Sequence, residues 1–328
     1  MLRRMLSRRA FSTALLALPL TGPAYGQAAD NARRAARGLK QLHAIIVQRG
    51  DELVLADAVR GPGLDSAANL KSCSKSIVAL LLGTAVARGE VRLNASLREV
   101  APRLIPANAT PGAAAITLED LVTLRAGLES TSGRNYGSWV NSENWVAYAL
   151  RRPMLDTPGG RMIYSTGSTH LLGAALATAT NKTLLQLARE RLGATLKIDV
   201  PGWTRDPQGF YFGGNEMALT PRAMLKIACL MRDRGRYGEA QVIPDSWVTA
   251  SITPRTRSPF SGLAYGYGWF LNDSGWVVAR GYGGQIIAAH PARRLAAVMT
   301  SDPAQPARSE GHFGDLMDLL EGPVTALA

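Results

Sequence analysis

The pattern of hydrophobic and polar positions predicts strands at both ends of the chain. Residues 43–59 contain two apolar runs separated by a turn at residues 49–51, which predicts a hairpin. Short β-like runs return near the C-terminus, at residues 265–271, 275–291 and 293–301, before a closing helix at residues 314–320. Because terminal strands must pair to bury their apolar faces, we expect one mostly antiparallel sheet built from both chain ends.

The middle of the chain has helical periodicity instead. Helical patterns occupy residues 117–128, 168–180, 183–192 and 220–235, the last beginning with a threonine cap and a proline at the first helical position. The expected fold class is therefore α/β in the α+β sense: an antiparallel sheet flanked by helices, with a second, mainly helical lobe at about residues 91–236. A length of 328 residues suits one large domain with lobes or two closely joined domains, and we expect a single domain.

One helical stretch carries candidate chemistry. Residues 71–90, KSCSKSIVALLLGTAVARGE, predict about five helical turns ending at Gly89, apolar nearly all round and therefore buried. Ser72 and Lys75 are three positions apart, so their side chains would be neighbours on one face. Burial would lower the pKa of Lys75 and leave free amine to activate the serine, whose backbone N–H at the helix start could stabilise an oxyanion. The alternative is a capping serine beside an ordinary lysine.

The N-terminus has the features of an export signal. It has an arginine-rich start, an apolar segment from Phe11 to Leu20, and small residues suited to cleavage before Gln27. Residues 7–11, SRRAF, resemble the twin-arginine signal, which implies export of an already folded protein. The apolar segment is shorter than the roughly 20 residues that span a bilayer. We therefore expect a twin-arginine signal at residues 1–26 and one mature domain at residues 27–328, in the bacterial periplasm or secreted.

Charge and composition set aside several classes of function. The formal net charge is +12, but the arginines are scattered and aromatic residues make up only 6% of the chain, unlike a nucleic-acid-binding stripe. The two cysteines, Cys73 and Cys229, lie in apolar helical patterns and are interpreted as buried free thiols. No metal-ligand spacing occurs, so no metal or other cofactor is expected. We interpret His170 as structural rather than as a base, and leave open whether Trp139 and Trp145 line a cleft or pack within the lobe.

Two further stretches give the serine and lysine a context. Tyr164 lies in a glycine- and serine-rich loop before a helix, and Gly283 and Gly284 lie within the expected strand at residues 275–291. Glycine inside a strand is costly unless something must approach the backbone closely. In this order, the three stretches resemble the penicillin-recognising serine hydrolases, which include serine β-lactamases, D-alanyl-D-alanine peptidases and related esterases and amidases. The resemblance covers essentially the whole mature chain.

The resemblance implies roles for three residues. Ser72 matches the acylated nucleophile and Lys75 its partner. Tyr164 matches the tyrosine of a Tyr-x-Asn element, whose phenol shuttles protons beside the lysine in the class C β-lactamase and esterase branches.

Two positions depart from the family pattern. Thr166 stands where the family usually has the asparagine that holds substrate amides and orients the lysine. Tyr282 stands where a lysine or histidine usually opens a Lys-Thr-Gly-like element, and its presence disfavours β-lactam turnover. The Gly-Gly-Gln sequence is similar to the branch of 6-aminohexanoate-dimer hydrolases and carboxylesterases. That likeness implies that the backbone N–H of Gln285 is the second oxyanion donor, or that of Gly284 if the register shifts by one.

The sequence thus predicts an exported serine hydrolase that cleaves a small-molecule ester or amide through an acyl-enzyme on Ser72. One alternative with the same fold is a penicillin-binding D-alanyl peptidase or a β-lactamase, which the export signal and the basic charge favour. Another alternative, motivated by Thr166 and Tyr282, is a catalytically silent binding protein on the same scaffold. No nucleic-acid partner and no stable membrane insertion are expected.

Overall fold

The structure is a computed structural model that describes residues 23–328, with side chains from Gly26 onward. The export signal expected at residues 1–26 lies outside the described residues, except for its last four positions. Those four positions form the beginning of helix α1 (Pro23–Gly38). Within the described residues, no helix is both long and apolar enough to cross a membrane.

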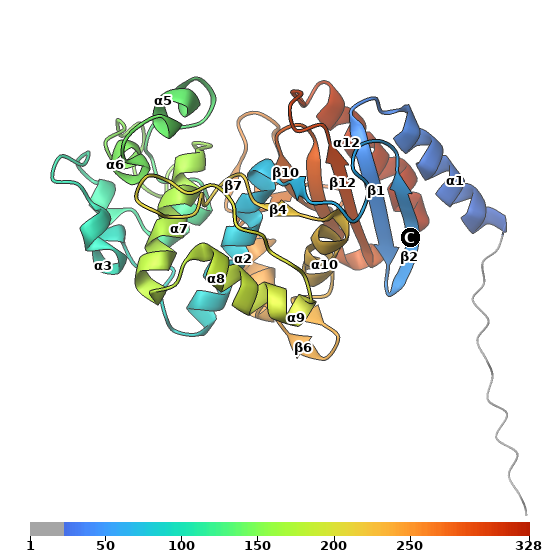
Figure 1. Ribbon diagram of the computed structural model, residues 1–328, viewed down its shortest axis with the longest axis horizontal. Coiled ribbons are helices and arrows are strands. Elements are labelled where there is room, and N and C mark those ends of the chain that lie inside the picture. The colour runs from blue at the N-terminus through green and yellow to red at the C-terminus, as the bar shows by residue number, and fades with distance from the viewer. Residues whose placement is uncertain (1–22) are drawn as a thin grey trace, which may run out of the picture.

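An antiparallel sheet lies in the right-hand part of the molecule in the view of Figure 1. In the described part of the chain it has eight strands, in the order β2-β1-β12-β11-β10-β9-β8-β7. The strands are β1 (Leu42–Arg49), β2 (Glu52–Ala58), β7 (Thr256–Arg257), β8 (Ala264–Tyr265), β9 (Phe270–Leu271), β10 (Val277–Gly281), β11 (Gln285–His290) and β12 (Leu295–Ser301). Because β1 pairs with both β2 and β12, the two ends of the chain share one sheet, which confirms the expected fold class.

The central strands are buried on both faces. All seven residues of β12 are buried, and alternate residues belong to different cores. Val298 shares a core with α2 (Ser74–Ala87) and α10 (Pro221–Arg232), and Met299 shares one with α1 and α12 (His312–Leu319). A strand covered on both sides has a nearly continuous apolar sequence instead of a period of two, as β11 and β12 do. The sheet is therefore the middle layer of the molecule.

Helices cover both faces of this sheet. Figure 1 shows α1 and α12 (His312–Leu319) on one side, and α2 (Ser74–Ala87) and α10 (Pro221–Arg232) on the other. Residues 74–85 of α2 are all buried, as their apolar sequence predicts. Each fully buried leucine in this helix contributes about 1.5–3 kcal/mol relative to an exposed one. Gly89, with φ +69°, follows the end of α2.

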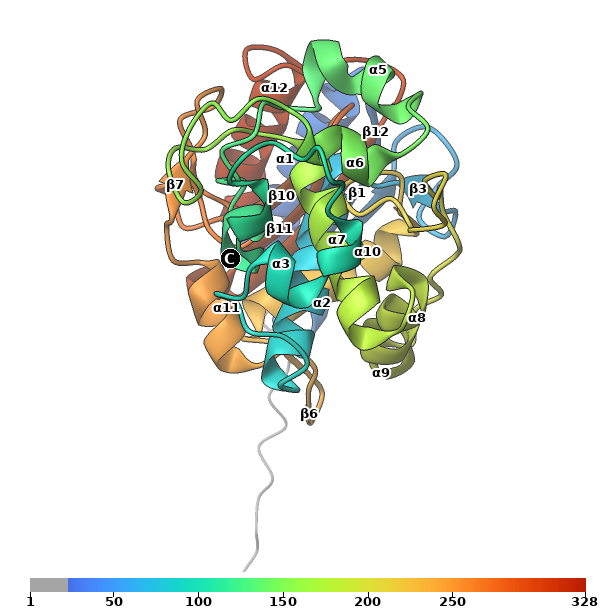
Figure 2. The same cartoon turned by 90° about the vertical axis from the view of Figure 1, so that its left-hand side faces the viewer.

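The helical lobe lies beyond α2, on the side away from the sheet, and faces the viewer in Figure 2. Its helices are α3 (Leu97–Val100), α4 (Leu118–Val122), α5 (Tyr136–Val140), α6 (Trp145–Leu150), α7 (Thr166–Thr180), α8 (Leu184–Ala188) and α9 (Ala194–Leu196). A π-helical turn, Arg189–Gly193, joins α8 to α9. The helix predicted at residues 117–128 is shorter than expected, because Leu124 adopts φ +58° two residues after α4 ends.

Smaller elements complete the fold. Helix α11 (Asp245–Ser251) precedes β7, and a short hairpin pairs β5 (Arg236–Tyr237) with β6 (Ala240–Gln241). A two-stranded antiparallel ladder joins β3 (Ala68–Asn69) to β4 (Ala218–Leu219), which are far apart in sequence. The β3–β4 pair matters for the site, because it fixes the chain just before α2 against the chain just before α10.

Candidate active site

Ser72 lies in a strained turn at the start of the buried helix. It is the middle residue of a 3₁₀ turn, Lys71–Cys73, that leads directly into α2, and its side chain is partly exposed. Lys71 adopts φ +48°, a left-handed conformation that costs a non-glycine residue about 1–2 kcal/mol. The Asn69 side chain accepts the Lys71 backbone N–H at 2.8 Å, and the Lys71 amine pairs with Glu216 at 3.0 Å. These contacts hold the turn in its strained shape.

Lys75 points at the Ser72 hydroxyl from within the protein. Its Nζ lies 3.0 Å from Ser72 Oγ, 3.2 Å from Thr166 Oγ1 and 2.8 Å from the Gly214 carbonyl oxygen. The residue is only 4% exposed, and this burial lowers the pKa of Lys75 to about 7. An amine that is about half neutral at pH 7 has a lone pair that can accept a proton.

Tyr164 lies beside both residues. Lys75 Nζ is 5.1 Å from the centre of its ring. Burial raises the pKa of the Tyr164 phenol to about 12, although a hydrogen bond with the Ser72 side chain lowers it in part. The phenol is therefore protonated near neutral pH and can donate a proton, whereas the lysine can accept one. The structure thus brings together Ser72, Lys75 and Tyr164 as predicted.

A short segment of the helical lobe holds the start of α7 in place. Ser130 Oγ donates to the Tyr164 carbonyl at 2.6 Å, and Ser132 Oγ accepts the Thr166 N–H at 2.9 Å. Between them, Thr131 Oγ1 accepts the N–H of the residue after Thr166 at 2.8 Å. We call residues 130–132 the Ser-Thr-Ser segment. The sequence analysis missed it, because three small polar residues in a loop have no distinctive periodicity or spacing.

A second segment, residues 213–217, lies against the nucleophile turn and was also missed. Besides the Gly214 carbonyl at Lys75, the Met217 carbonyl accepts the Leu70 N–H at 2.8 Å, and the Met217 N–H donates to Ser74 Oγ at 3.2 Å. A Cβ on Gly214 would lie 2.9 Å from the Thr166 carbonyl oxygen, so only glycine fits between α2 and α7. The adjacent glycines in FGGNE were the one available signal.

The glycine-rich element at the end of β10 differs from the expectation. Gly283 and Gly284 lie in the turn between β10 and β11, with φ of +81° and +95°, and not inside a strand. The turn needs these left-handed conformations, which glycine adopts without strain. The expected close approach is nevertheless present, because an added Cβ on Gly283 would lie 2.5 Å from the Asp302 carbonyl oxygen. Gly281 is approached as closely, since a Cβ there would overlap the Leu70 carbonyl oxygen of the nucleophile turn.

Gln285 and Tyr282 flank this turn in different environments. The Gln285 backbone lies beside the nucleophile turn, because its carbonyl accepts the Cys73 thiol at 3.4 Å. Its side chain is buried and donates to the Ser301 carbonyl at 2.8 Å, so only its backbone can face the site. Tyr282 is 52% exposed. The Cys73 thiol is buried, which raises its pKa well above the usual range, as expected for a packed residue.

Arg280 brings a positive charge close to Tyr164, and the sequence analysis did not single it out. It precedes Gly281 on β10, and its guanidinium lies 4.2 Å from the centre of the Phe313 ring. Its charge lowers the pKa of Tyr164, while burial lowers the pKa of Arg280 itself. A cation therefore stands on β10 near the phenol, although residue 282 is a tyrosine.

His170 belongs to the packing of the lobe. Its ring is fully buried, and Nε2 lies 2.9 Å from Asp206 Oδ2. Trp139, Trp145 and Phe212 surround it with ring centres 5.5–5.9 Å away. The open question about the two tryptophans is thus answered in favour of lobe packing.

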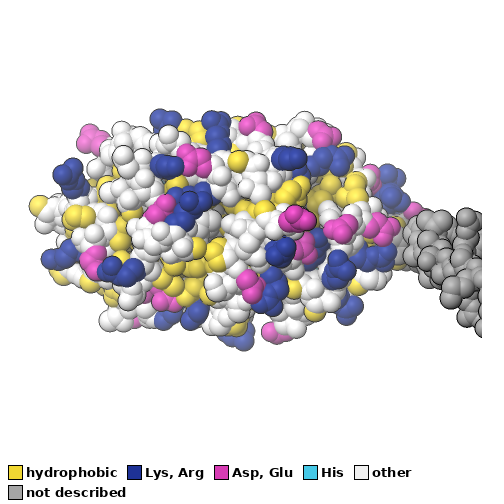
Figure 3. Space-filling view, turned by 90° about the horizontal axis from the view of Figure 1, so that it is seen from below, with side chains coloured by type: hydrophobic (Ala, Val, Ile, Leu, Met, Phe, Trp, Pro, Cys, Tyr) yellow, Lys and Arg dark blue, Asp and Glu magenta, His cyan; other side chains and the backbone are white. Residues whose placement is uncertain are grey.

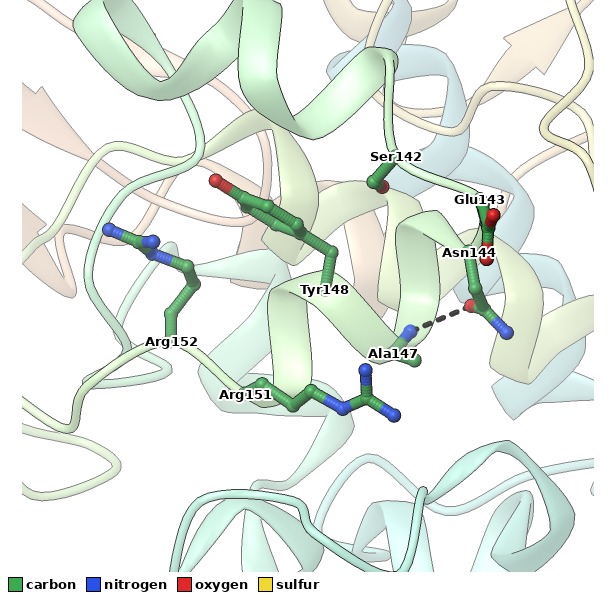
Figure 4. Close-up of a pocket in the computed structure, with 7 residues that line it drawn as sticks. All are labelled: Ser142, Glu143, Asn144, Ala147, Tyr148, Arg151 and Arg152. Atoms are coloured by element: carbon green, nitrogen blue, oxygen red, sulfur yellow. Dashed lines mark hydrogen bonds between the residues drawn. The ribbon is translucent and has the colours of Figure 1, made fainter.

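A surface hollow of about 380 Å³ lies on the same lobe, away from this chemistry (Figure 4). It is lined by Ser142, Glu143, Asn144, Ala147, Tyr148, Arg151 and Arg152. None of these residues belongs to the cluster around Ser72. Charges of both signs are interspersed on the face drawn in Figure 3, without a basic stripe.

Comparison with known proteins identifies the family. A sequence model of the β-lactamase family matches residues 28–318, so this chain belongs to that family of serine hydrolases. Among curated proteins, D-alanyl-D-alanine-carboxypeptidase/endopeptidase AmpH from Escherichia coli K12 is 30% identical over 154 residues, which is 44% of this chain and 39% of AmpH. The chain therefore matches well under half the length of this relative.

Solved structures show the same fold. A penicillin-binding protein homologue from Caulobacter crescentus superimposes with a TM-score of 0.75 and 16% identity, covering 94% of this chain and 98% of the homologue. EstCE1, a hydrolase with promiscuous acyltransferase activity, also gives 0.75, with 15% identity over 91% of this chain and 99% of EstCE1.

Proposed function

We propose that this protein cleaves an ester or amide through an acyl-enzyme on Ser72. The observation that carries the proposal is the 3.0 Å contact between Ser72 Oγ and the buried amine of Lys75. Ser72 Oγ attacks the substrate carbonyl carbon while its proton passes to Lys75 Nζ. Backbone N–H groups of Ser72 and Gln285 stabilise the oxyanion that forms.

The pKa values of Lys75 and Tyr164 suit different proton transfers: the lysine accepts a proton and the tyrosine donates one. When the tetrahedral intermediate collapses, the bond to the leaving group breaks and Tyr164 donates its proton to that group. The phenolate then recovers a proton from the Lys75 ammonium. In the second half, the same pair takes a proton from water, which attacks the acyl carbon, and Ser72 regains its proton as the acid is released.

Covalent labelling tests this proposal. A fluorophosphonate probe should label the protein with one probe per chain at Ser72, and Ser72→Ala should abolish the label. Ser138→Ala, at an exposed serine of α5, is the matched control and should label like the wild type. Equal labelling of wild type and Ser72→Ala would refute an acyl-enzyme on Ser72.

A penicillin-binding peptidase or β-lactamase is the second candidate, and Arg280 is the observation that favours it. A cation beside Tyr164 could pair with the carboxylate of a β-lactam or of a D-alanyl peptide. A fluorescent penicillin adduct on Ser72 would support this candidate. Rapid hydrolysis of p-nitrophenyl esters without any penicillin adduct would instead leave an esterase or amidase.

We further propose that residues 1–26 direct export and that residues 27–328 act as one catalytic domain, with the lobe at 91–236 supplying Tyr164 and Thr166. The twin arginines Arg8 and Arg9 support this proposal. Replacing both with lysine should leave the precursor uncleaved in the cytoplasm of a bacterial host. Unchanged export of that variant would refute a twin-arginine signal.

A further inference from the structure

Lys75, Thr166 and Ser132 form a chain of hydrogen-bonding groups that leads from the buried amine to the edge of the site. Thr166 Oγ1 lies 3.2 Å from Lys75 Nζ and 2.9 Å from Ser132 Oγ. Lys75 and Thr166 are each only 4% exposed, whereas Ser132 is partly exposed, like Ser72 and Tyr164. Ser132 is thus the member of the chain that a substrate can reach.

The hydrogen atoms on these groups can be placed by elimination. A neutral amine has two hydrogens and one lone pair, and Lys75 has three neighbours: Ser72, Thr166 and the Gly214 carbonyl. The carbonyl can only accept, so one hydrogen points to Gly214. The second hydrogen points to one of the two hydroxyl groups, and the lone pair faces the other.

Only one of the two arrangements supports catalysis. If Thr166 accepts from the amine, it must donate its own hydrogen to Ser132, and the lone pair of Lys75 faces the Ser72 hydroxyl. If the Ser132 hydroxyl instead donates to Thr166 Oγ1, the Thr166 hydroxyl can donate to the lone pair of Lys75. The amine then has no lone pair free to accept the Ser72 proton. The direction of the Ser132 hydroxyl therefore sets whether Lys75 can accept the Ser72 proton.

We propose that Ser132 binds substrate by donating a hydrogen bond to a second oxygen acceptor on the acyl part, and that Thr166 is a positioning residue that couples this contact to Lys75. The inference rests on the proposed function, since it concerns the same acyl-enzyme. Ser132 already accepts the Thr166 N–H at 2.9 Å. When it also accepts the Thr166 hydroxyl, its own hydrogen points outward.

This arrangement specifies a substrate class. Ser132 Oγ is linked to Ser72 Oγ through contacts of 2.9, 3.2 and 3.0 Å, so the two oxygens lie at most about 9 Å apart and one acyl group carrying a second acceptor can contact both. The preferred substrates are N-acylamino acid esters or amides, whose amide oxygen provides the second acceptor. Simple alkanoyl esters lack this group and leave the Ser132 hydroxyl unused.

The relay is tested by fluorophosphonate labelling rates of the full-length protein, because an alkyl fluorophosphonate has no second acceptor. Ser132→Ala removes the acceptor of the Thr166 hydroxyl, which then turns to the Lys75 lone pair, and the rate should fall about tenfold. Thr166→Val removes that hydroxyl, so in the Ser132→Ala background it should relieve the block on the Lys75 lone pair. The double variant should then label faster than Ser132→Ala alone. Thr166→Ala replaces the valine variant if the latter does not fold.

Additive losses in the double variant, or a Ser132→Ala rate equal to wild type, would overturn the relay. Failure of the wild type to label at Ser72 would instead refute the proposed function, so the two failures are distinguishable.

The substrate contact is tested with two esters that share a leaving group. Wild type should have a higher kcat/KM for the p-nitrophenyl ester of N-acetylglycine than for p-nitrophenyl butyrate, and Ser132→Ala should lower that ratio about tenfold. Thr166→Ser keeps the hydroxyl and should preserve the ratio. An unchanged ratio in Ser132→Ala would refute substrate binding by Ser132.

Discussion

The rate of acylation should follow the titration of Lys75. Burial of this side chain lowers its pKa from 10.5 to about 7. At pH 7 about half of the molecules then have the free amine, against roughly one in 3,000 for an unshifted lysine. The second-order rate of fluorophosphonate labelling should therefore rise about tenfold per pH unit below pH 7 and level off above pH 8. A midpoint at pH 9 or above, or a flat profile between pH 5 and 9, would contradict the role of Lys75 as base.

The same titration should affect stability, with a sign that follows from the direction of the shift. The folded-state pKa lies below the unfolded one, so burial of the charge destabilises the fold in full below pH 7, and this penalty is relieved as the pH rises toward 10.5. Relative to a Lys75→Met variant, the wild-type free energy of unfolding should increase by about 1.4 kcal/mol per pH unit between pH 7 and 9. Urea unfolding of both proteins measures this difference. A constant difference across that range would mean that Lys75 is not neutral in the fold.

Three further substitutions test other parts of the site. Gly281→Ala would push the Leu70 carbonyl and the nucleophile turn away. We therefore expect a fluorophosphonate labelling rate at least tenfold slower and a free energy of unfolding about 2 kcal/mol lower. The control Gly137→Ala, which has no atom near the added Cβ, should behave like wild type in both the labelling and the unfolding assay. His170→Ala should lower the free energy of unfolding in urea by about 3 kcal/mol, because it leaves the buried Asp206 carboxylate without its histidine partner. The labelling rate of the folded fraction should stay within twofold of wild type. A changed pH profile of labelling would instead place His170 in catalysis. Tyr164→Phe should lower kcat about a hundredfold for amides and less for p-nitrophenyl esters, whose leaving group departs without a proton; equal losses would refute its role as proton donor.

The sequence predicted the parts of the site that lie within one element. Ser72 and Lys75 belong to one continuous turn and helix, so their spacing of three residues was enough to place them together. The sheet was predictable for a similar reason, because the apolar runs at both chain ends must be covered. Local pattern and tertiary structure agree at these positions.

The parts that sequence could not predict are contacts made between elements. The Gly214 carbonyl contacts Lys75 and the Ser132 hydroxyl contacts Thr166, and both groups lie in loops. In a loop, neither periodicity nor spacing indicates which residue a side chain will contact. The early end of α4 depends on the left-handed conformation of Leu124, a residue type that gives no such indication. Arg280 was overlooked because its neighbours suggested only a strand.

The three contacts of Lys75 come from the nucleophile turn, the helical lobe and the segment before α10. The amine is thus the meeting point of parts of the chain that are far apart in sequence. Loosening of any one of them would misdirect or hydrate the base before the sheet itself melted. On gentle heating, hydrolytic activity should therefore be lost at a temperature where the circular dichroism spectrum is still that of the folded protein.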